Sequence, residues 1–142
     1  MAIYDELIRN AMRVRIIGAG IFSETDFQFE NKNFNPSGKE IWVSESWIGG
    51  DEQVYTNIRT QIPTALVQYD IYVPENTGAL MAGQAANAIE REFSINSWKA
   101  RIEVPSLPET DICVYKTGMS VRSEEPWFVM SLLLYLRIIG NE

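Results

Sequence analysis

The side chains that most often perform enzyme chemistry are scarce in this chain. It contains no histidine, which removes the commonest general base and metal ligand, and its one cysteine is Cys113. A serine or cysteine nucleophile paired with histidine is therefore excluded, as are an intramolecular disulfide and a cysteine-based structural zinc site. Cys113 lies near Asp111 and Lys116, but no known motif joins the three residues. We interpret Cys113 as a small buried core residue.

Carboxylates offer a second kind of chemistry. Glu24, Asp26 and Glu30, with Glu75 elsewhere, could in principle hold a hard cation or act in glycoside hydrolysis. Their spacing does not match a calcium loop, so we interpret them as solvated surface charge. The segment Gly18-Ala19-Gly20 follows a helical pattern instead of opening one, which indicates a helix cap and not a dinucleotide-binding turn. The sequence thus predicts a protein that is not an enzyme and has no cofactor and no metal site.

Composition and charge restrict the class of protein further. The 142 residues carry a net charge of −7, with 19 acidic and 12 basic residues and no basic block. Tight DNA binding is not expected, because it needs a positive stripe that neutralises phosphates. The length fits one domain over residues 1–142. The N-terminal segment is acidic where a signal peptide is basic, and no apolar run approaches the roughly 18 residues of a membrane span. We expect a cytoplasmic protein without a membrane segment.

Hydrophobic periodicity predicts two helices. The first spans residues 2–17 and ends at the glycines that follow it, and the second spans residues 78–93 behind Thr77, which can act as its N-cap. Alanine and glycine are frequent in the second helix, which allows a close approach to a sheet or to another subunit. The stripes expected to be buried are Ile3, Leu7, Ala11 and Val14 in the first helix and Met81, Ala85, Ile89 and Phe93 in the second.

The remaining chain predicts a sheet. The expected strands are residues 25–30, 41–48, 52–60, 64–73, 101–104, 112–115 and 127–139. The segment Gly49-Gly50-Asp51 predicts a hairpin between the second and third strands. Both alternate faces of the last strand are apolar, which predicts a central strand covered on both sides. The fold class expected is α+β, with a mixed, mainly antiparallel sheet of six or seven strands and two helices packed on it.

Three segments occur in an order and spacing typical of one protein family. In residues 69–78 an alternating strand stops at a proline and turns directly into a helix; residues 27–36 lead through a polar loop into residues 40–44; and residues 126–129 open the last strand. In this arrangement the chain resembles the tail terminator proteins of long-tailed phages. The resemblance covers about residues 1–139 and rests on strand-and-turn patterns, not on a catalytic signature.

The resemblance implies a structural virion protein at the head-proximal end of the tail, assembled in the host cytoplasm. Proteins of this family form a ring, typically a hexamer, on the end of the tail tube, stop its polymerisation and present a docking surface to the head or neck. The implied partners are further copies of the chain, the tail tube protein and a head-completion or neck protein. Genomic DNA would pass through the lumen without specific binding, and a negatively charged lumen would repel its phosphates.

Two loops are the candidate contacts with a subunit or the tube. They contain Asn33, Phe34, Asn35 and Pro36, and Gly49, Gly50, Asp51 and Glu52. The tryptophans, expected in the core or in an interface, are Trp42, Trp47, Trp98 and Trp127. Three alternative functions stay open: a head-completion or neck protein that joins portal and tail, a small acidic adaptor that binds a host protein, and an enzyme that uses only carboxylates and lysine.

Overall fold

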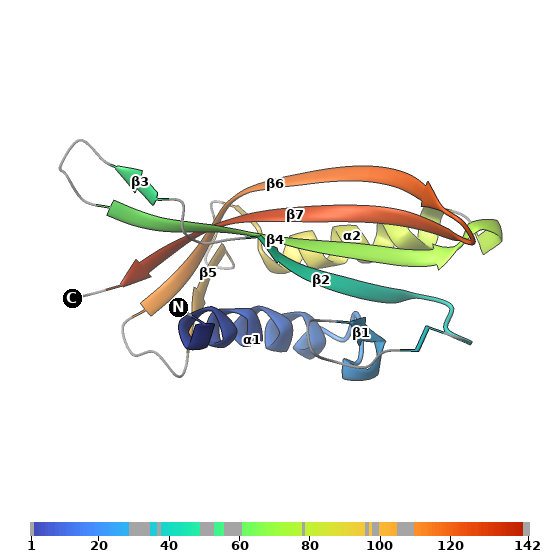
Figure 1. Ribbon diagram of the computed structural model, residues 1–142, viewed down its shortest axis with the longest axis horizontal. Helices are drawn as coiled ribbons and strands as arrows, with labels where there is room; N and C mark the ends of the chain where they lie inside the picture. Colours follow the sequence, from blue (N-terminus) through green and yellow to red (C-terminus); the bar gives the residue numbers. More distant parts are fainter. Residues whose placement is uncertain are drawn as a thin grey trace.

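Two helices lie on one side of a curled seven-stranded sheet in the computed structural model (Figure 1). The structure describes residues 2–28, 35–36, 38–48, 53–55, 61–77, 79–95, 97, 100–104 and 110–140. The helices are α1 (Ala2–Gly18) and α2 (Ala79–Glu92), and short 3-10 turns are η1 (Glu24–Asp26) and η2 (Glu75–Thr77). The strands are β1 (Phe27–Gln28), β2 (Trp42–Ile48), β3 (Gln53–Tyr55), β4 (Gln61–Pro74), β5 (Arg101–Glu103), β6 (Thr110–Glu124) and β7 (Trp127–Gly140). The predicted fold class is confirmed.

Three long strands form the centre of the sheet. The strand order is β1-β2-β4-β7-β6-β5, and β3 pairs with β4 outside this path. β1 runs parallel to β2, whereas the other pairs are antiparallel. β4 and β7 pair without interruption from Thr64 opposite Arg137 to Pro74 opposite Trp127. This continuous pairing fixes which side chains lie on each face, because successive residues of a strand point to opposite sides.

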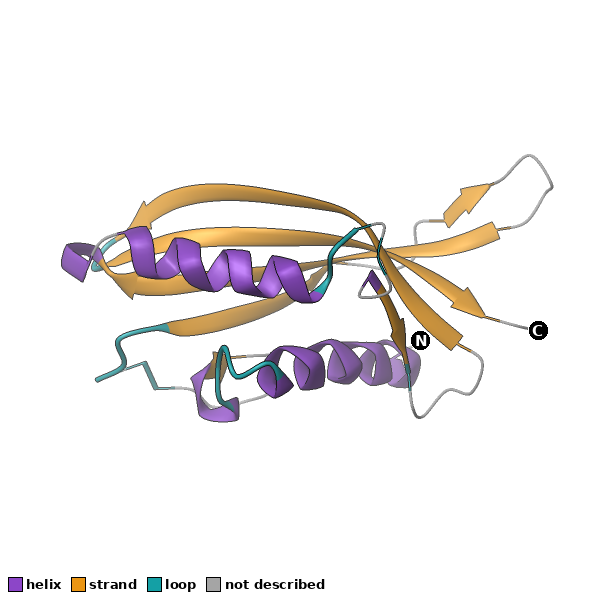
Figure 2. Cartoon of the chain, turned by 180° about the vertical axis from the view of Figure 1, so that it is seen from behind, coloured by secondary structure: helices purple, strands orange, loops and turns teal. Residues whose placement is uncertain are grey.

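The hydrophobic core lies between the sheet and the helices, which cover the same face (Figure 2). The helices contribute Ile8, Met12 and Ile16 of α1 and Ala82, Ala86 and Ile89 of α2, with Phe93 just after α2. From β4 and β7 the core includes Val67, Tyr69, Ile71, Leu132, Leu134 and Leu136. Burying each large apolar side chain stabilises the fold by about 1.5–3 kcal/mol. The two helices are therefore held chiefly by this one layer of contacts.

The predicted helical stripes are correct in part. In α1, Ala11 is buried, but Val14 is 59% exposed, and Ile8, Met12 and Ile16 form the buried face. The buried face of the helix is thus rotated relative to the predicted stripe, and the side chain of Ile3 lies outside the described part. Gly20 follows α1 with φ +80, which confirms the predicted glycine cap.

In α2 two alanines belong to the buried face. Ile89 is fully buried as predicted, whereas Met81 and Ala85 are half-buried, and Ala82 and Ala86 are fully buried in their place. Small side chains therefore form much of the buried face of α2.

The predicted hairpin around the glycine pair is wrong. β2 and β3 each pair with β4, with Ile48 opposite Leu66 and Gln53 opposite Pro63, and no pairing between β2 and β3 occurs in the described ranges. The 14-residue β4 is long enough to take both strands in succession. β2 and β3 are therefore neighbours of the same strand, and the glycine pair itself lies outside the described residues.

Two further strand predictions need correction. The strand predicted over residues 112–115 is instead the long β6, which continues to Glu124 because β7 pairs with it along this length. β7 is central, as predicted, between β4 and β6. However, the helices cover only one of its faces (Figure 2). The apolar residues of the other face therefore need a different cover.

Candidate interaction surface on the open face of the sheet

The face of the sheet opposite the helices is called here the open face. Its side chains alternate with those of the core, so their positions follow from the strand register. It includes Trp42 of β2, Gln68, Asp70 and Tyr72 of β4, Trp127, Val129, Ser131 and Tyr135 of β7, and Lys116 and Arg122 of β6. Aromatic, polar and cationic groups occupy successive parts of this face.

An aromatic cluster covers one end of the open face. Trp42 and Tyr72 stack with their ring centroids 3.9 Å apart and 4° between the ring planes. Trp127 meets both rings edge-on, at 5.7 Å from Trp42 and 6.4 Å from Tyr72. Val129 is fully buried and belongs to the same cluster, which explains how an apolar residue of the open face is shielded without a helix. Burial and the nearby carboxylates Glu124 and Asp70 raise the pKa of Tyr72, which keeps its hydroxyl neutral.

A polar network occupies the middle of the open face. Asp70 is buried and accepts hydrogen bonds from Ser131 Oγ at 2.6 Å and Gln68 Nε2 at 2.8 Å. Arg122 donates to Ser131 Oγ at 2.8 Å and approaches Asp70 at 3.4 Å through Nη2, and its Nε bonds Glu124 at 3.0 Å. The network links β4, β6 and β7 and compensates for the burial of Asp70.

A group of two tyrosines and two cations forms what we call the cation–tyrosine patch. It consists of Tyr115, Lys116, Tyr135 and Arg137. A β-bulge sets Tyr115 and Lys116 against Tyr135 alone, so both side chains reach the open face. Lys116 Nζ lies 4.9 Å from the Tyr135 ring centroid, and Arg137 Cζ lies 4.5 Å from that of Tyr115. Both distances are within the range of cation–π attraction.

On the helical side, a buried ion pair joins α1 to β2. Arg13 Nε donates to Glu45 Oε1 at 3.0 Å, and Tyr69 donates its hydroxyl proton to Glu45 Oε2 at 3.1 Å. Burial raises the pKa of Glu45, although Arg13 and Tyr69 act in the opposite direction. Burial and the Glu45 charge also hold the pKa of Tyr69 well above its usual value. This carboxylate is enclosed by its partners, which fits a structural role.

The candidate carboxylates do not assemble into one site. Asp26 bonds Lys39 at 3.1 Å and Ser23 at 3.1 Å, and these bonds outweigh the effect of burial and lower the pKa of Asp26. Glu75 instead accepts a bond from Ser123 at 2.7 Å at the far end of β4. Glu30 lies outside the described residues. Within the described ranges no group of three or more histidine, cysteine or acidic residues is placed to hold a metal ion.

The expectation of a buried cysteine needs correction. Cys113 is half-buried and lies opposite Arg137 in the β6–β7 register. Ile112 and Val114 point into the core, so Cys113 faces the open side. Asp111 is engaged by Arg101 at 2.7 Å. These contacts do not join Cys113, Asp111 and Lys116 into a reactive site.

The structure describes few of the candidate loop residues. Asn35 is exposed and Pro36 is half-buried, with the Pro36 carbonyl accepting a bond from Lys39 N at 3.1 Å. The loop predictions for Asn33, Phe34, Gly49, Gly50, Asp51 and Glu52 lie outside the described residues. Trp98 does as well. Trp47 is half-buried on the helical side, with the Arg9 guanidinium 5.4 Å from its ring centroid.

Hollows lined by described residues occur on the helical side. One of about 380 Å³ lies between α1 and the η1–β1 segment and is lined in part by Asn10, Val14 and Phe27. Another of about 240 Å³ lies at the end of α2 beside Ser94 and Ile95. The linings combine a few polar groups with apolar side chains and do not bring a nucleophile and a base together. No helix in the described ranges has the length and hydrophobicity to cross a membrane.

Comparisons with known proteins inform the fold alone. No protein-family model matches the chain, and no curated protein matches it. Among 28 matching chains of solved structures, one whose name says nothing of its function superposes with a TM-score of 0.70. It covers 97% of this chain and 97% of its own length, at 14% sequence identity. The fold is therefore similar to one already known in a solved structure.

Sequence reasoning missed the polar network and the cation–tyrosine patch. Ser131 is a polar residue within an otherwise apolar strand, and Asp70 is a charged residue within an alternating one. These two interruptions could have suggested a pairing, since a buried polar group needs a partner. Nothing in the sequence marks the bulge that places Tyr115 and Lys116 on the same face.

Proposed function

We propose that the chain is a phage tail terminator, a structural virion protein that forms a ring of subunits on the end of the tail tube. In this role it stops tube polymerisation and provides the docking surface for a head-completion or neck protein. The ring is proposed to be a hexamer, through which genomic DNA passes without specific binding. The protein is not an enzyme under this proposal and acts through surfaces alone.

The observation that carries the proposal is the open face of the sheet. The strands that form its centre are long, with 14 residues in β4, 15 in β6 and 14 in β7, and helices cover only their other side. The open face carries ordered aromatic and charged side chains from several strands. Such a surface suits a subunit whose task is to contact other subunits, and it adds to the resemblance in strand and turn order. Ring closure requires two different, complementary surfaces on each subunit.

Imaging with tail tubes tests the proposal. The purified chain would be added to polymerising tube protein from the same phage, and tube length and tube ends would be examined by negative-stain electron microscopy. We expect shorter tubes whose ends carry a ring of extra density. Tubes of unchanged length with bare ends would overturn the proposal. A stable monomer that captures a host protein would favour the adaptor, and turnover lost on changing one carboxylate would favour an enzyme.

A further inference from the structure

Two cations on the open face have no carboxylate beside them in the described part of the chain. Lys116 and Arg137 each lie over a tyrosine ring, at 4.9 Å and 4.5 Å. By contrast, several other basic residues of the described ranges bond a carboxylate. These include Arg13, Lys39, Arg101 and Arg122. The cation–tyrosine patch is thus a positively charged surface on an acidic protein.

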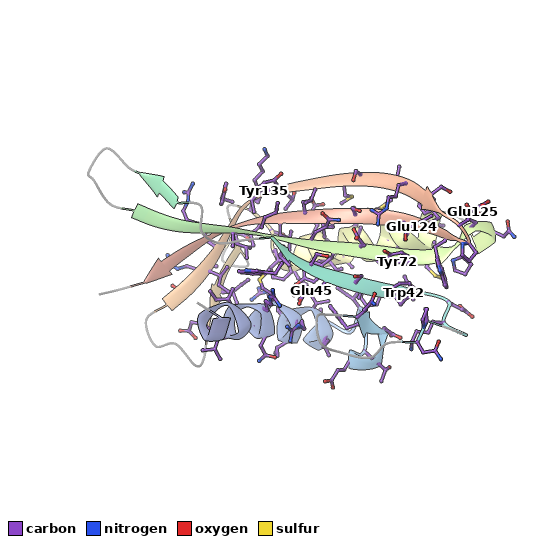
Figure 3. All side chains as sticks on the ribbon, viewed as in Figure 1. Trp42, Glu45, Tyr72, Glu124, Glu125 and Tyr135 are labelled. Atoms are coloured by element: carbon purple, nitrogen blue, oxygen red, sulfur yellow. The ribbon has the colours of Figure 1, made fainter. Side chains whose placement is uncertain are left out.

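An excess of negative charge lies at the other end of the same strands. Glu75, Glu124 and Glu125 lie where β4 ends and β6 turns into β7, and we call this region the acidic end. Arg122 is shared between Asp70 and Glu124, Glu75 accepts a bond from the Ser123 hydroxyl, and Glu125 is exposed. The carboxylates of the acidic end therefore outnumber the Arg122 guanidinium, which pairs with Glu124. Figure 3 shows Glu124 and Glu125 at one end of the sheet and Tyr135 well away from them along it.

The two charged regions cannot meet within one chain. A strand rises about 3.3 Å per residue, so Lys116 and Glu124 start about 26 Å apart along β6. Continuous pairing with β7 keeps this separation fixed. A second copy that lies against the first can bring the two oppositely charged regions together.

We propose that the cation–tyrosine patch of one copy receives the acidic end of a second copy of this chain. The contact joins two different surfaces, so it is head-to-tail and can propagate from copy to copy until a ring closes. The two tyrosine rings would provide a flat apolar surface, and Lys116 and Arg137 would bind the incoming carboxylates. This inference rests on the proposed ring function and deepens it by naming the surfaces that join the subunits.

Cross-linking at the native cysteine tests the geometry. Cys113 lies opposite Arg137 and beside the patch, and Glu125 is exposed at the acidic end. In the variant Glu125→Cys, a short bismaleimide linker should join the new thiol of one chain to Cys113 of the next. Because each chain then carries two thiols in different surfaces, we expect a ladder of trimers and larger species. The matched control is Asn87→Cys, which places a thiol on an exposed position of α2. No ladder, dimers alone, or an equal ladder in the control would overturn the inference.

Charge reversal tests the chemistry of the contact. Lys116→Glu with Arg137→Glu, added to Glu125→Cys, should lower the yield of trimers about tenfold, because carboxylates would then face carboxylates. Adding Glu75→Lys should restore part of that yield. Unchanged cross-linking in the first variant would overturn the inference.

The tube assay separates this inference from the proposed function. If the Lys116→Glu, Arg137→Glu variant capped tail tubes normally, the proposed tail terminator function would stand and the proposed contact between copies would be refuted. A charge-dependent ladder without any capping would keep the contact and refute the function.

Discussion

Arg13 Nε lies 3.0 Å from Glu45 Oε1, and the two side chains are 9% and 1% exposed. The pair links α1 to β2 at the edge of the core. The Tyr69 hydroxyl donates a hydrogen bond to the second carboxylate oxygen of Glu45. An isolated charge in such a place would be costly, because it would have lost its water without gaining a partner. The position of α1 therefore depends on this pair as well as on apolar contacts.

Removing Arg13 should destabilise the fold strongly. In Arg13→Met the Glu45 carboxylate keeps its burial but loses its cation, and we expect a loss of about 3–5 kcal/mol in the free energy of unfolding. Denaturant unfolding followed by circular dichroism measures the change. The matched control is Arg101→Met, which removes an ion pair of 2.7 Å whose arginine side chain is 60% exposed. It should cost less than about 1 kcal/mol. Equal losses in both variants would contradict the structural role of the buried pair.

Glu45 should make stability fall as pH rises through its titration range. Its pKa is raised in the folded state from an ordinary value of 4.5, so between the two values the folded protein holds more protons than the unfolded chain. Stability attributable to this group is greatest below pH 4.5 and is reduced once pH exceeds the folded-state pKa. Comparing unfolding free energies of the wild type and Glu45→Gln at about pH 4 and about pH 7 isolates the effect. If the wild type instead became more stable relative to Glu45→Gln as pH rises, the pKa of Glu45 would be lowered in the folded state.

Ile89 should be essential for the packing of α2. Ile89 is fully buried against the sheet, so Ile89→Asp places an unpaired carboxylate in the core at a cost of several kcal/mol. We expect an unfolded or insoluble chain. Asn87→Asp, on an exposed position of the same helix, should leave the melting temperature nearly unchanged. A soluble Ile89→Asp variant with the stability of the wild type would show that this helix face is exposed.

Association of the chain should be strongest at intermediate salt. At about 0.01 M ionic strength the screening length is about 30 Å, so the −7 charge of each copy repels its neighbours as a whole. At about 0.15 M the length is about 8 Å, which removes this repulsion but preserves contacts between the patch and the acidic end. At about 1 M it is about 3 Å, and these contacts weaken too. Sedimentation velocity across this range measures the response, and association that rises steadily to the highest salt would argue against a charged contact.

Several features followed from the sequence alone because they depend on local patterns. The periodicity of α1 and α2, the alternation of β4 and the apolar run of β7 predicted the elements and the α+β class correctly. The lack of histidine likewise excluded whole classes of chemistry on composition alone, because those reactions need an imidazole.

Only the tertiary structure decided which strands pair and which faces meet. The glycine pair after Ile48 suggested a hairpin, but the long β4 took both neighbouring strands, because pairing depends on partners distant in sequence. The rotation of α1 that exposes Val14 depended on the shape of the core. The bulge beside Tyr115 brought this residue and Lys116 to one face, although strict alternation would separate them. The open face, the cation–tyrosine patch and the acidic end thus depend on strand register and pairing. A short stretch of sequence does not determine these.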